Sequence, residues 1–78
     1  MQVLEFELRG QYIALDALLK ATGLAPSGGA AKALVAAGQV QVDGLVELRK
    51  RCKIRAGQVV TLAGAFIKVA SAPGGAAA

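Results

Sequence analysis

Apolar and charged positions alternate at the start of the chain. Leucine and phenylalanine at positions 4, 6 and 8 fall between Glu5, Glu7 and Arg9. A period of two is typical of a strand with one side in water and the other on a core. We therefore expect a short strand over residues 2–9, ended by the glycine at position 10.

The period becomes helical between residues 12 and 22. Leu15, Leu18, Leu19 and Thr22 recur at the spacing i, i+3, i+4, i+7, and a glycine that can close the helix follows. A second helix is expected from Ser27, whose side chain can cap it, to about residue 37. Because this second helix is rich in Gly and Ala, it needs close packing on other elements to be stable.

Strand patterns return after residue 38. Residues 39–48 alternate on both sides of Asp43-Gly44, a favoured two-residue hairpin turn, and residues 59–62 and 66–69 form two further short apolar runs. The last residues, 71–78, read SAPGGAAA and are expected to form a disordered tail after a single domain, residues 1–70. The predicted class is α+β, with two packed helices against a small, mostly antiparallel sheet of three to five short strands.

Composition restricts the chemistry that this chain can perform. Its 78 residues allow one core, built from Ala, Val, Leu and Ile with Phe6, Tyr12 and Phe66 as large fillers. The chain has no His and a single Cys, Cys52, so we expect no zinc site, no internal disulfide and no Cys-His catalysis. We predict a protein that is not an enzyme and uses no cofactor and no small-molecule substrate.

Neither a signal peptide nor a membrane span is expected. The first residues lack a basic leader and a long apolar stretch. The longest charge-poor run, residues 21–31, is much shorter than the roughly 20 apolar residues that a transmembrane helix needs. The sequence is therefore expected to belong to a cytoplasmic protein, and we expect a monomer.

The positive charge is concentrated in one segment. The net charge is +4, and residues 49–55, RKRCKIR, hold five of the nine Lys and Arg residues. The chain outside this segment has four cationic and five acidic side chains, so its net charge is −1. Such local concentration indicates a surface for a polyanion.

We expect the basic segment to be a strand, in which alternate side chains face opposite sides. The outward row would be Arg49, Arg51, Lys53 and Arg55, and the inward side chains Cys52 and Ile54. Lys50 breaks the alternation, which indicates a bulge, a strand end, or a lysine whose charged head reaches solvent. Cys52 is expected to be an inert core residue.

Several interpretations of the basic segment remain open. It could be an edge strand that charge protects from aggregation, but three arginines suit bidentate phosphate binding better. A membrane surface would require a basic amphipathic helix, which neither predicted helix is. Nucleic acid fits better, through phosphate contacts and shape, because few aromatic side chains are present for base stacking. An adaptor whose basic face binds an acidic protein is the alternative function.

Residues 14–62 resemble the S-four RNA-binding domain, named after a small-subunit ribosomal protein. The matching stretch reads LDALLKATGLAPSGGAAKALVAAGQVQVDG. Family positions matched in this stretch are Leu15, Asp16, Leu18 or Leu19, Gly23, Ser27, Ala31, Leu34, Gly38, Val40, Val42, Asp43 and Gly44. The later segments VDGLVELRKRCKI and AGQVV resemble the small stand-alone bacterial members of the YbcJ type.

The resemblance implies a helix-turn-helix-like pair, the αL motif, whose surface binds structured RNA together with the adjoining strand, ribosomal or transfer RNA being candidates. The matching basic positions are Lys32, Arg49, Lys50, Arg51, Lys53 and Arg55. From the residues themselves, the backbone N–H groups at Ser27 and Gly28 could hold one phosphate, although glycines there could equally serve helix packing. The family usually has Arg at the positions of Ala14 and Gly28, so the binding surface is expected to shift toward residues 49–55.

Overall fold

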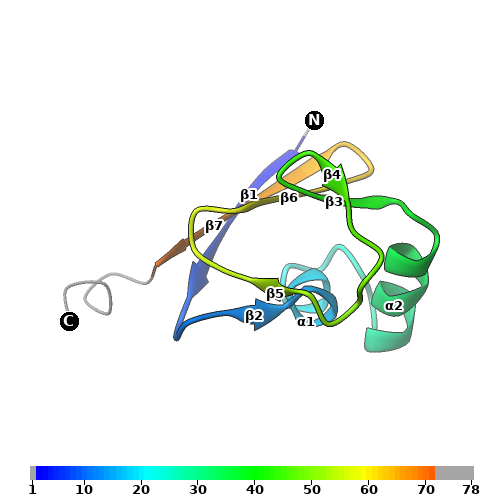
Figure 1. The fold of residues 1–78 in the computed structure, drawn as a ribbon, viewed down its shortest axis with the longest axis horizontal. Helices are drawn as coiled ribbons and strands as arrows, with labels where there is room; N and C mark the ends of the chain where they lie inside the picture. Colours follow the sequence, from blue (N-terminus) through cyan, green and yellow to red (C-terminus); the bar gives the residue numbers. More distant parts are fainter. Residues whose placement is uncertain (1, 72–78) are drawn as a thin grey trace.

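Two helices, a five-stranded sheet and a two-stranded ribbon make up residues 2–71 (Figure 1). The computed structural model describes residues 2–71. The elements in chain order are β1 (Gln2–Leu8), β2 (Ile13–Ala14), α1 (Leu15–Ala21), α2 (Gly28–Ala36), β3 (Val40–Val42), β4 (Leu45–Val46), β5 (Lys53–Ile54), β6 (Val59–Leu62) and β7 (Ala65–Ser71). The expected α+β class is confirmed.

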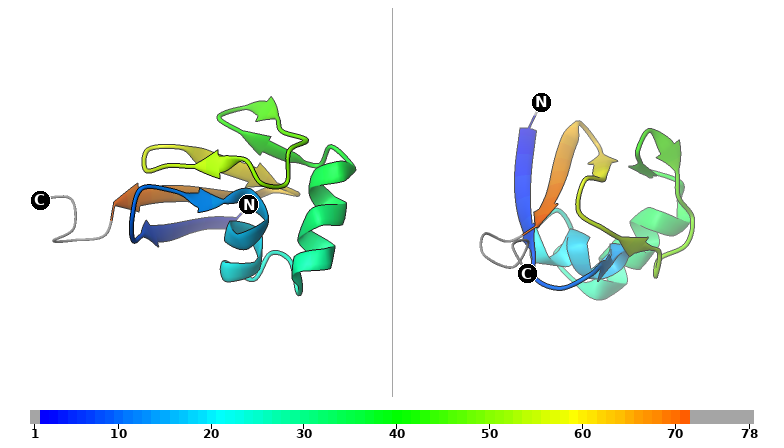
Figure 2. Two further views of the ribbon diagram at one scale, coloured as in Figure 1. Left: turned by 60° about the horizontal axis from the view of Figure 1, so that its bottom comes forward. Right: turned by 60° about the vertical axis from the view of Figure 1, so that its left-hand side comes forward.

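The main sheet has the strand order β1-β7-β6-β3-β4 and is antiparallel except for one pair. The first strand, β1, lies parallel to the last strand, β7, with Leu4 beside Ile67 and Leu8 beside Ser71 (Figure 2). A second sheet contains only β2 and β5, in which Ile13 pairs with Ile54 and Ala14 with Lys53. This ribbon joins the chain segment before α1 to the basic segment.

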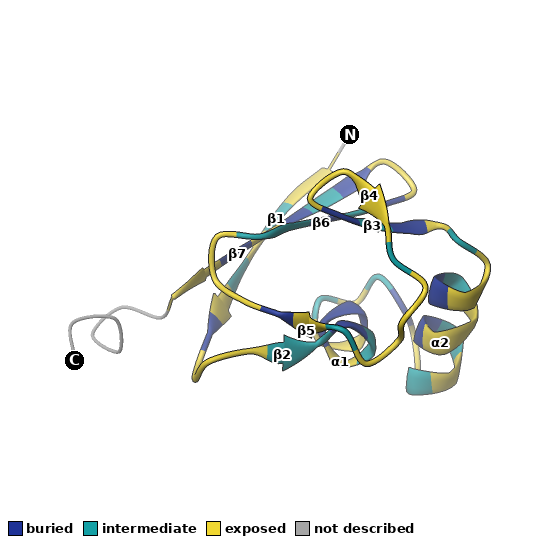
Figure 3. Cartoon of the chain, in the orientation of Figure 1, coloured by how far each residue is buried: buried dark blue, intermediate teal, exposed yellow. Residues whose placement is uncertain are grey.

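The core lies between the helix pair and the sheet (Figure 3). Helix α1 buries Leu15, Leu18 and Leu19, and α2 buries Ala31 and Val35. Their partners in the cluster from the strands include the fully buried Val40, Ile54, Val60 and Ile67. Alternation along β7 places Lys68 on the exposed side between buried Ile67 and Val69, so one face of the sheet is left to solvent.

Helix α2 forms as expected, whereas α1 is shorter than predicted. Ser27 caps α2 by accepting a hydrogen bond from the Ala30 backbone N–H to its Oγ at 3.1 Å. Helix α1 begins at Leu15 and not near residue 12, because Ile13 and Ala14 are extended and pair with β5. Within residues 2–71, neither helix has the length and apolar run needed to cross a membrane.

The hairpin at Asp43-Gly44 is confirmed. Asp43 and Gly44 have φ angles of 52° and 83°, as the primed two-residue turn requires, and Val42 pairs with Leu45. The Asp43 carboxylate also accepts hydrogen bonds from the Val59 backbone N–H at 3.0 Å and the Gln58 side-chain amide at 3.2 Å. One aspartate therefore both forms the turn and holds the start of β6.

Three expectations about individual residues need correction. Phe66 is not a core filler, because it lies half-buried on the face of β7 opposite buried Ile67 and outside the core cluster. Tyr12 is 47% exposed and is not a core filler, since it precedes β2 and its ring lies against the Lys53 side chain. Ser71 is the last residue of β7 and not the first residue of a tail. The remainder of the expected tail, residues 72–78, lies outside the described residues.

Candidate nucleic-acid interface

The basic segment is mainly a turn. The backbone N–H of Cys52 donates to the carbonyl of Arg49 at 3.1 Å, which places Lys50 and Arg51 at the tip of the turn. Only Lys53 and Ile54, the two residues of β5, form a strand. The prediction of a strand over the whole segment is therefore wrong. Its inward assignments agree with the structure, because Ile54 is buried and Cys52 packs against the core.

Helix α1 holds this turn in place. Ala14 at its N-cap offers no side-chain acceptor, and the first backbone N–H groups of a helix need partners from outside it. The N–H of Leu15 donates to the carbonyl of Cys52 at 2.9 Å, and the N–H of Asp16 donates to the carbonyl of Lys50 at 3.0 Å. The basic turn thus acts as the cap of α1, and its position relative to the helix is set by backbone hydrogen bonds.

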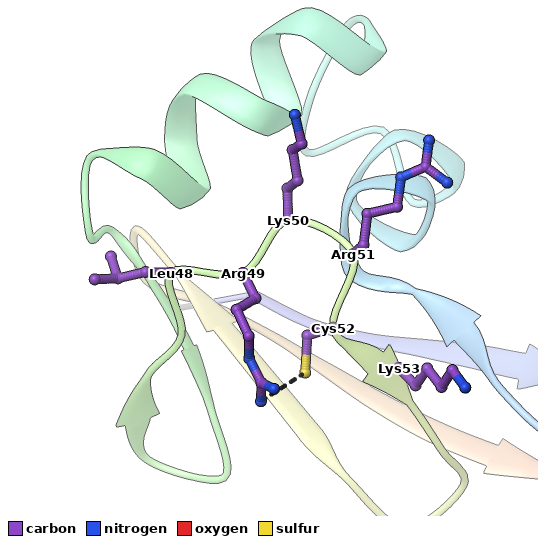
Figure 4. A pocket seen from close by; sticks show the side chains of 6 residues that line it. All are labelled: Leu48, Arg49, Lys50, Arg51, Cys52 and Lys53. Carbon is purple, nitrogen blue, oxygen red and sulfur yellow. Dashed lines mark hydrogen bonds between the residues drawn. The ribbon is translucent and has the colours of Figure 1, made fainter.

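Arg51 shares an open groove of about 320 Å³ with the two helices. Lys20 lines it from α1, and Gly28 and Lys32 line it from α2. Ala14, Asp16 and Ala17 complete the lining. We call this the helix–loop groove. Figure 4 shows Lys50 pointing to the same side of the turn as Arg51, toward the helix pair.

The helix–loop groove carries a net positive charge. Lys20, Lys32 and Arg51 supply three cations against the single carboxylate of Asp16, and the three cations are exposed. None of them forms a salt bridge within residues 2–71. Asp16 Oδ1 accepts a hydrogen bond from the Ala17 backbone N–H at 2.9 Å. The three cations can therefore bind an external anion without breaking an internal ion pair.

At the N-terminus of α2, Gly28 adds one backbone donor to the same groove. Among the described residues, the N–H groups of Gly28 and Gly29 have no hydrogen-bond partner, whereas Ala30 is capped by Ser27. A helix N-terminus carries roughly half a positive charge and favours phosphate. A Cβ atom built at Gly28 would meet no atom within 4 Å, so this backbone is open to a ligand.

Arg49 lies apart from this arrangement. Its guanidinium pairs with Glu47 in a bidentate way, with Nε–Oε2 and Nη2–Oε1 distances of 3.0 and 3.2 Å, and its backbone N–H also donates to Oε2. These hydrogen bonds lower the pKa of Glu47 to about 2. In Figure 4, Arg49 points to the side of the turn opposite Lys50. Its charge is balanced by Glu47, and its contacts stabilise the base of the turn.

Cys52 lies beneath Arg49. The Arg49 Nη2 donates to its Sγ at 4.0 Å. Burial, followed by the neighbouring Glu47, raises the pKa of the Cys52 thiol. Since the thiolate is the nucleophilic form, this environment agrees with the expected inert core residue.

The remaining predicted site residues occupy separate places. Lys53 Nζ lies 4.9 Å from the centroid of the Tyr12 ring. Arg55 follows β5, where its backbone N–H donates to Gln58 Oε1 at 2.7 Å. The Ser27 side chain is used as the cap of α2. Lys20 was not among the predicted site residues. Its position four residues after Asp16 places both side chains on one face of the helix, which could have indicated that Lys20 belongs to the same surface.

The positions where the family resemblance expects arginine, Ala14 and Gly28, both line the helix–loop groove. Arg51 and Lys20 bring cations to the same groove from other elements. The charge absent from the expected positions is therefore supplied from the turn and from α1.

Comparison with known proteins gives consistent matches. The family model described as S4 domain matches residues 6–70. YbcJ of Escherichia coli (strain K12) is 53% identical over 58 residues, which cover 74% of this chain and 83% of that protein. YbcJ of Shigella flexneri matches with the same identity and coverage. The solution structure of E. coli YbcJ superimposes with a TM-score of 0.66 and 45% identity, over 91% of this chain and 89% of that one, and is described as revealing an αL motif involved in RNA binding.

Proposed function

Because this chain belongs to the S4 (S-four) domain family, we propose that it is a non-catalytic protein that binds structured RNA through phosphates held in the helix–loop groove. The observation that carries the proposal is the convergence of Lys20, Lys32 and Arg51 with the N-terminus of α2. The αL motif described for the E. coli YbcJ structure supports it. Neither the family nor the groove favours the alternative of an adaptor for an acidic protein.

The groove fits recognition of a phosphate backbone. Double-stranded RNA is bound mainly through its shape, its phosphates and its 2′-hydroxyl groups. Arg51 can bind one phosphate in a bidentate way, and the two lysines provide point charges beside it. Lys50 extends the same side of the turn, and Lys53 continues the charge along β5. Arg49 acts indirectly, because its pair with Glu47 stabilises the base of the turn.

The salt dependence of binding tests this proposal. If Lys20, Lys32, Lys50 and Arg51 each neutralise one phosphate, log K should fall with log salt at a slope of about −3 to −4. Fluorescence anisotropy with a labelled RNA duplex, at several potassium chloride concentrations, measures that slope. Absence of salt-dependent binding to any duplex or hairpin RNA would refute the proposed function.

A pair of charge-matched variants tests the location. Arg51→Gln removes one cation from the groove, and we expect weaker binding together with a slope that is smaller by about one. Lys68→Gln removes one cation from the sheet face opposite the helices, and we expect the slope to stay unchanged. Equal effects of the two variants would show that the protein attracts RNA by net charge alone and would place binding outside the groove.

A further inference from the structure

Tyr12 is an exposed aromatic side chain next to Lys53 of the basic segment. Its residue is 47% exposed, and its hydroxyl forms no hydrogen bond within residues 2–71. The ammonium of Lys53 lies over its ring, 4.9 Å from the centroid. Neither burial nor a polar contact of the hydroxyl accounts for an aromatic residue at this position.

The Tyr12 ring also lines a second open groove, of about 330 Å³, between β1 and β2. The other lining residues are Phe6, Glu7, Leu8, Arg9 and Ile13. Four of the six are apolar or aromatic, and the cation of Arg9 is offset by the carboxylate of Glu7. An apolar slot with an aromatic wall is suited to one base, which can stack on the ring. The ammonium of Lys53 beside the ring is available to the phosphate of the same nucleotide.

Strand β2 contributes to both grooves, because Ile13 lines the second groove and Ala14 lines the helix–loop groove. Ala14 lines the helix–loop groove and pairs with Lys53 in the β2–β5 ribbon. Tyr12 precedes Ala14 by two residues, which corresponds to roughly 7 Å of extended chain. An RNA held at Arg51 can therefore reach Tyr12 past Lys53. Bases inside a duplex are already stacked on each other, so only an unpaired nucleotide can present its face to Tyr12.

We propose that Tyr12 is a base-stacking residue and that the RNA ligand is a stem with an unpaired nucleotide beside the bound duplex. This inference rests on the proposed function, because it extends the same RNA-binding surface. Lys53, whose ammonium lies over the Tyr12 ring, and Arg9, which lines the same groove as Tyr12, are the cations available to the phosphates of that nucleotide. The ligand class is thus narrower than duplex RNA and includes stems with a bulge, a loop or an overhang.

Tyrosine fluorescence tests the inference directly. Tyr12 is the single tyrosine of the chain, which has no tryptophan, so the intrinsic emission reports on this residue alone. The protein is titrated with a blunt RNA duplex and with the same duplex carrying a two-nucleotide unpaired extension, and affinity is followed by anisotropy of a label on the RNA. We expect both RNAs to bind, the extended RNA to bind about 5- to 150-fold more tightly, and only the extended RNA to quench Tyr12.

Two variants separate stacking from simple apolar contact. Tyr12→Phe keeps a flat ring and should keep the preference for the extended RNA, whereas Tyr12→Leu should bind both RNAs with the affinity of the blunt duplex. Thermal unfolding of each variant checks that the fold is intact. Unchanged Tyr12 emission with the extended RNA, or a preference retained in Tyr12→Leu, overturns this inference while leaving the proposed function in place. Failure of both RNAs to bind overturns the proposed function and this inference together.

Discussion

Replacement of Gly28 by alanine should affect stability and RNA binding in opposite directions. Gly28 is the first residue of α2 and has no positive φ angle, and an added Cβ would meet no atom within 4 Å. Glycine to alanine at a compatible position stabilises a protein by about 0.4 to 1 kcal/mol, because the unfolded chain loses conformational freedom. We therefore expect Gly28→Ala to raise the free energy of unfolding by an amount in this range.

The same methyl group should weaken RNA binding. Gly28 lines the helix–loop groove, where its backbone N–H has no partner among the described residues. A hydrogen bond to a charged group contributes about 1.5 to 3 kcal/mol. Loss of one phosphate contact at this position therefore corresponds to about 10- to 150-fold weaker binding. Anisotropy titration of a labelled RNA stem measures this loss, and urea denaturation measures the gain in stability.

Gly29→Ala is the matched control. Gly29 does not line the groove, and a Cβ atom added there would lie 3.9 Å from Ser27 Oγ, an ordinary contact. We expect a similar gain in stability from this variant with unchanged RNA affinity. If Gly28→Ala binds RNA as tightly as Gly29→Ala and the unsubstituted protein do, the N-terminus of α2 does not hold a phosphate. That result would refute the reasoning about this part of the groove.

Two further predictions concern stability alone. The folded-state pKa of Glu47, about 2, lies below its ordinary value of 4.5, so its stabilising contribution is present above pH 4.5 and is lost as the pH falls toward 2. As the pH is lowered across this range, the urea midpoint should fall less steeply in Glu47→Gln and Arg49→Gln than in the unsubstituted protein. The same pH dependence in both variants as in the unsubstituted protein would contradict a stabilising Glu47–Arg49 pair. Ala63 has a φ of 48° in the turn between β6 and β7, so Ala63→Asn should raise the free energy of unfolding by about 1 kcal/mol and the melting temperature by about 4 to 8 °C. The exposed strand residue Ala70 provides the control, and a gain in Ala70→Asn equal to that in Ala63→Asn would exclude relief of backbone strain as its cause.

Local signals account for the elements that were predicted well. The Ser27 side chain caps α2 within three residues, and Asp43-Gly44 determines its own turn, so neither depends on distant parts of the chain. The period-two pattern likewise placed β1, whose apolar side faces the core. The basic segment was recognised as a surface feature because its five cations are neighbours in the sequence, so its charge is known without the structure. For the start of α1 the local pattern was misleading, because pairing of Ile13 with Ile54 competes with the helix.

The sequence by itself determined the class of the fold, the second helix, the hairpin at Asp43-Gly44 and the presence of one concentrated cationic segment, because each depends on residues that are neighbours in the chain. Only the tertiary structure decided which cations act together. Backbone hydrogen bonds from Leu15 and Asp16 turn the basic segment toward α1 and bring Arg51 to Lys20 and Lys32, while Glu47 holds Arg49 on the other side. Pairing between β2 and β5 likewise places Tyr12 under Lys53. Except for the Glu47–Arg49 pair, these contacts join residues far apart in sequence, and their geometry follows from packing that a linear pattern does not contain.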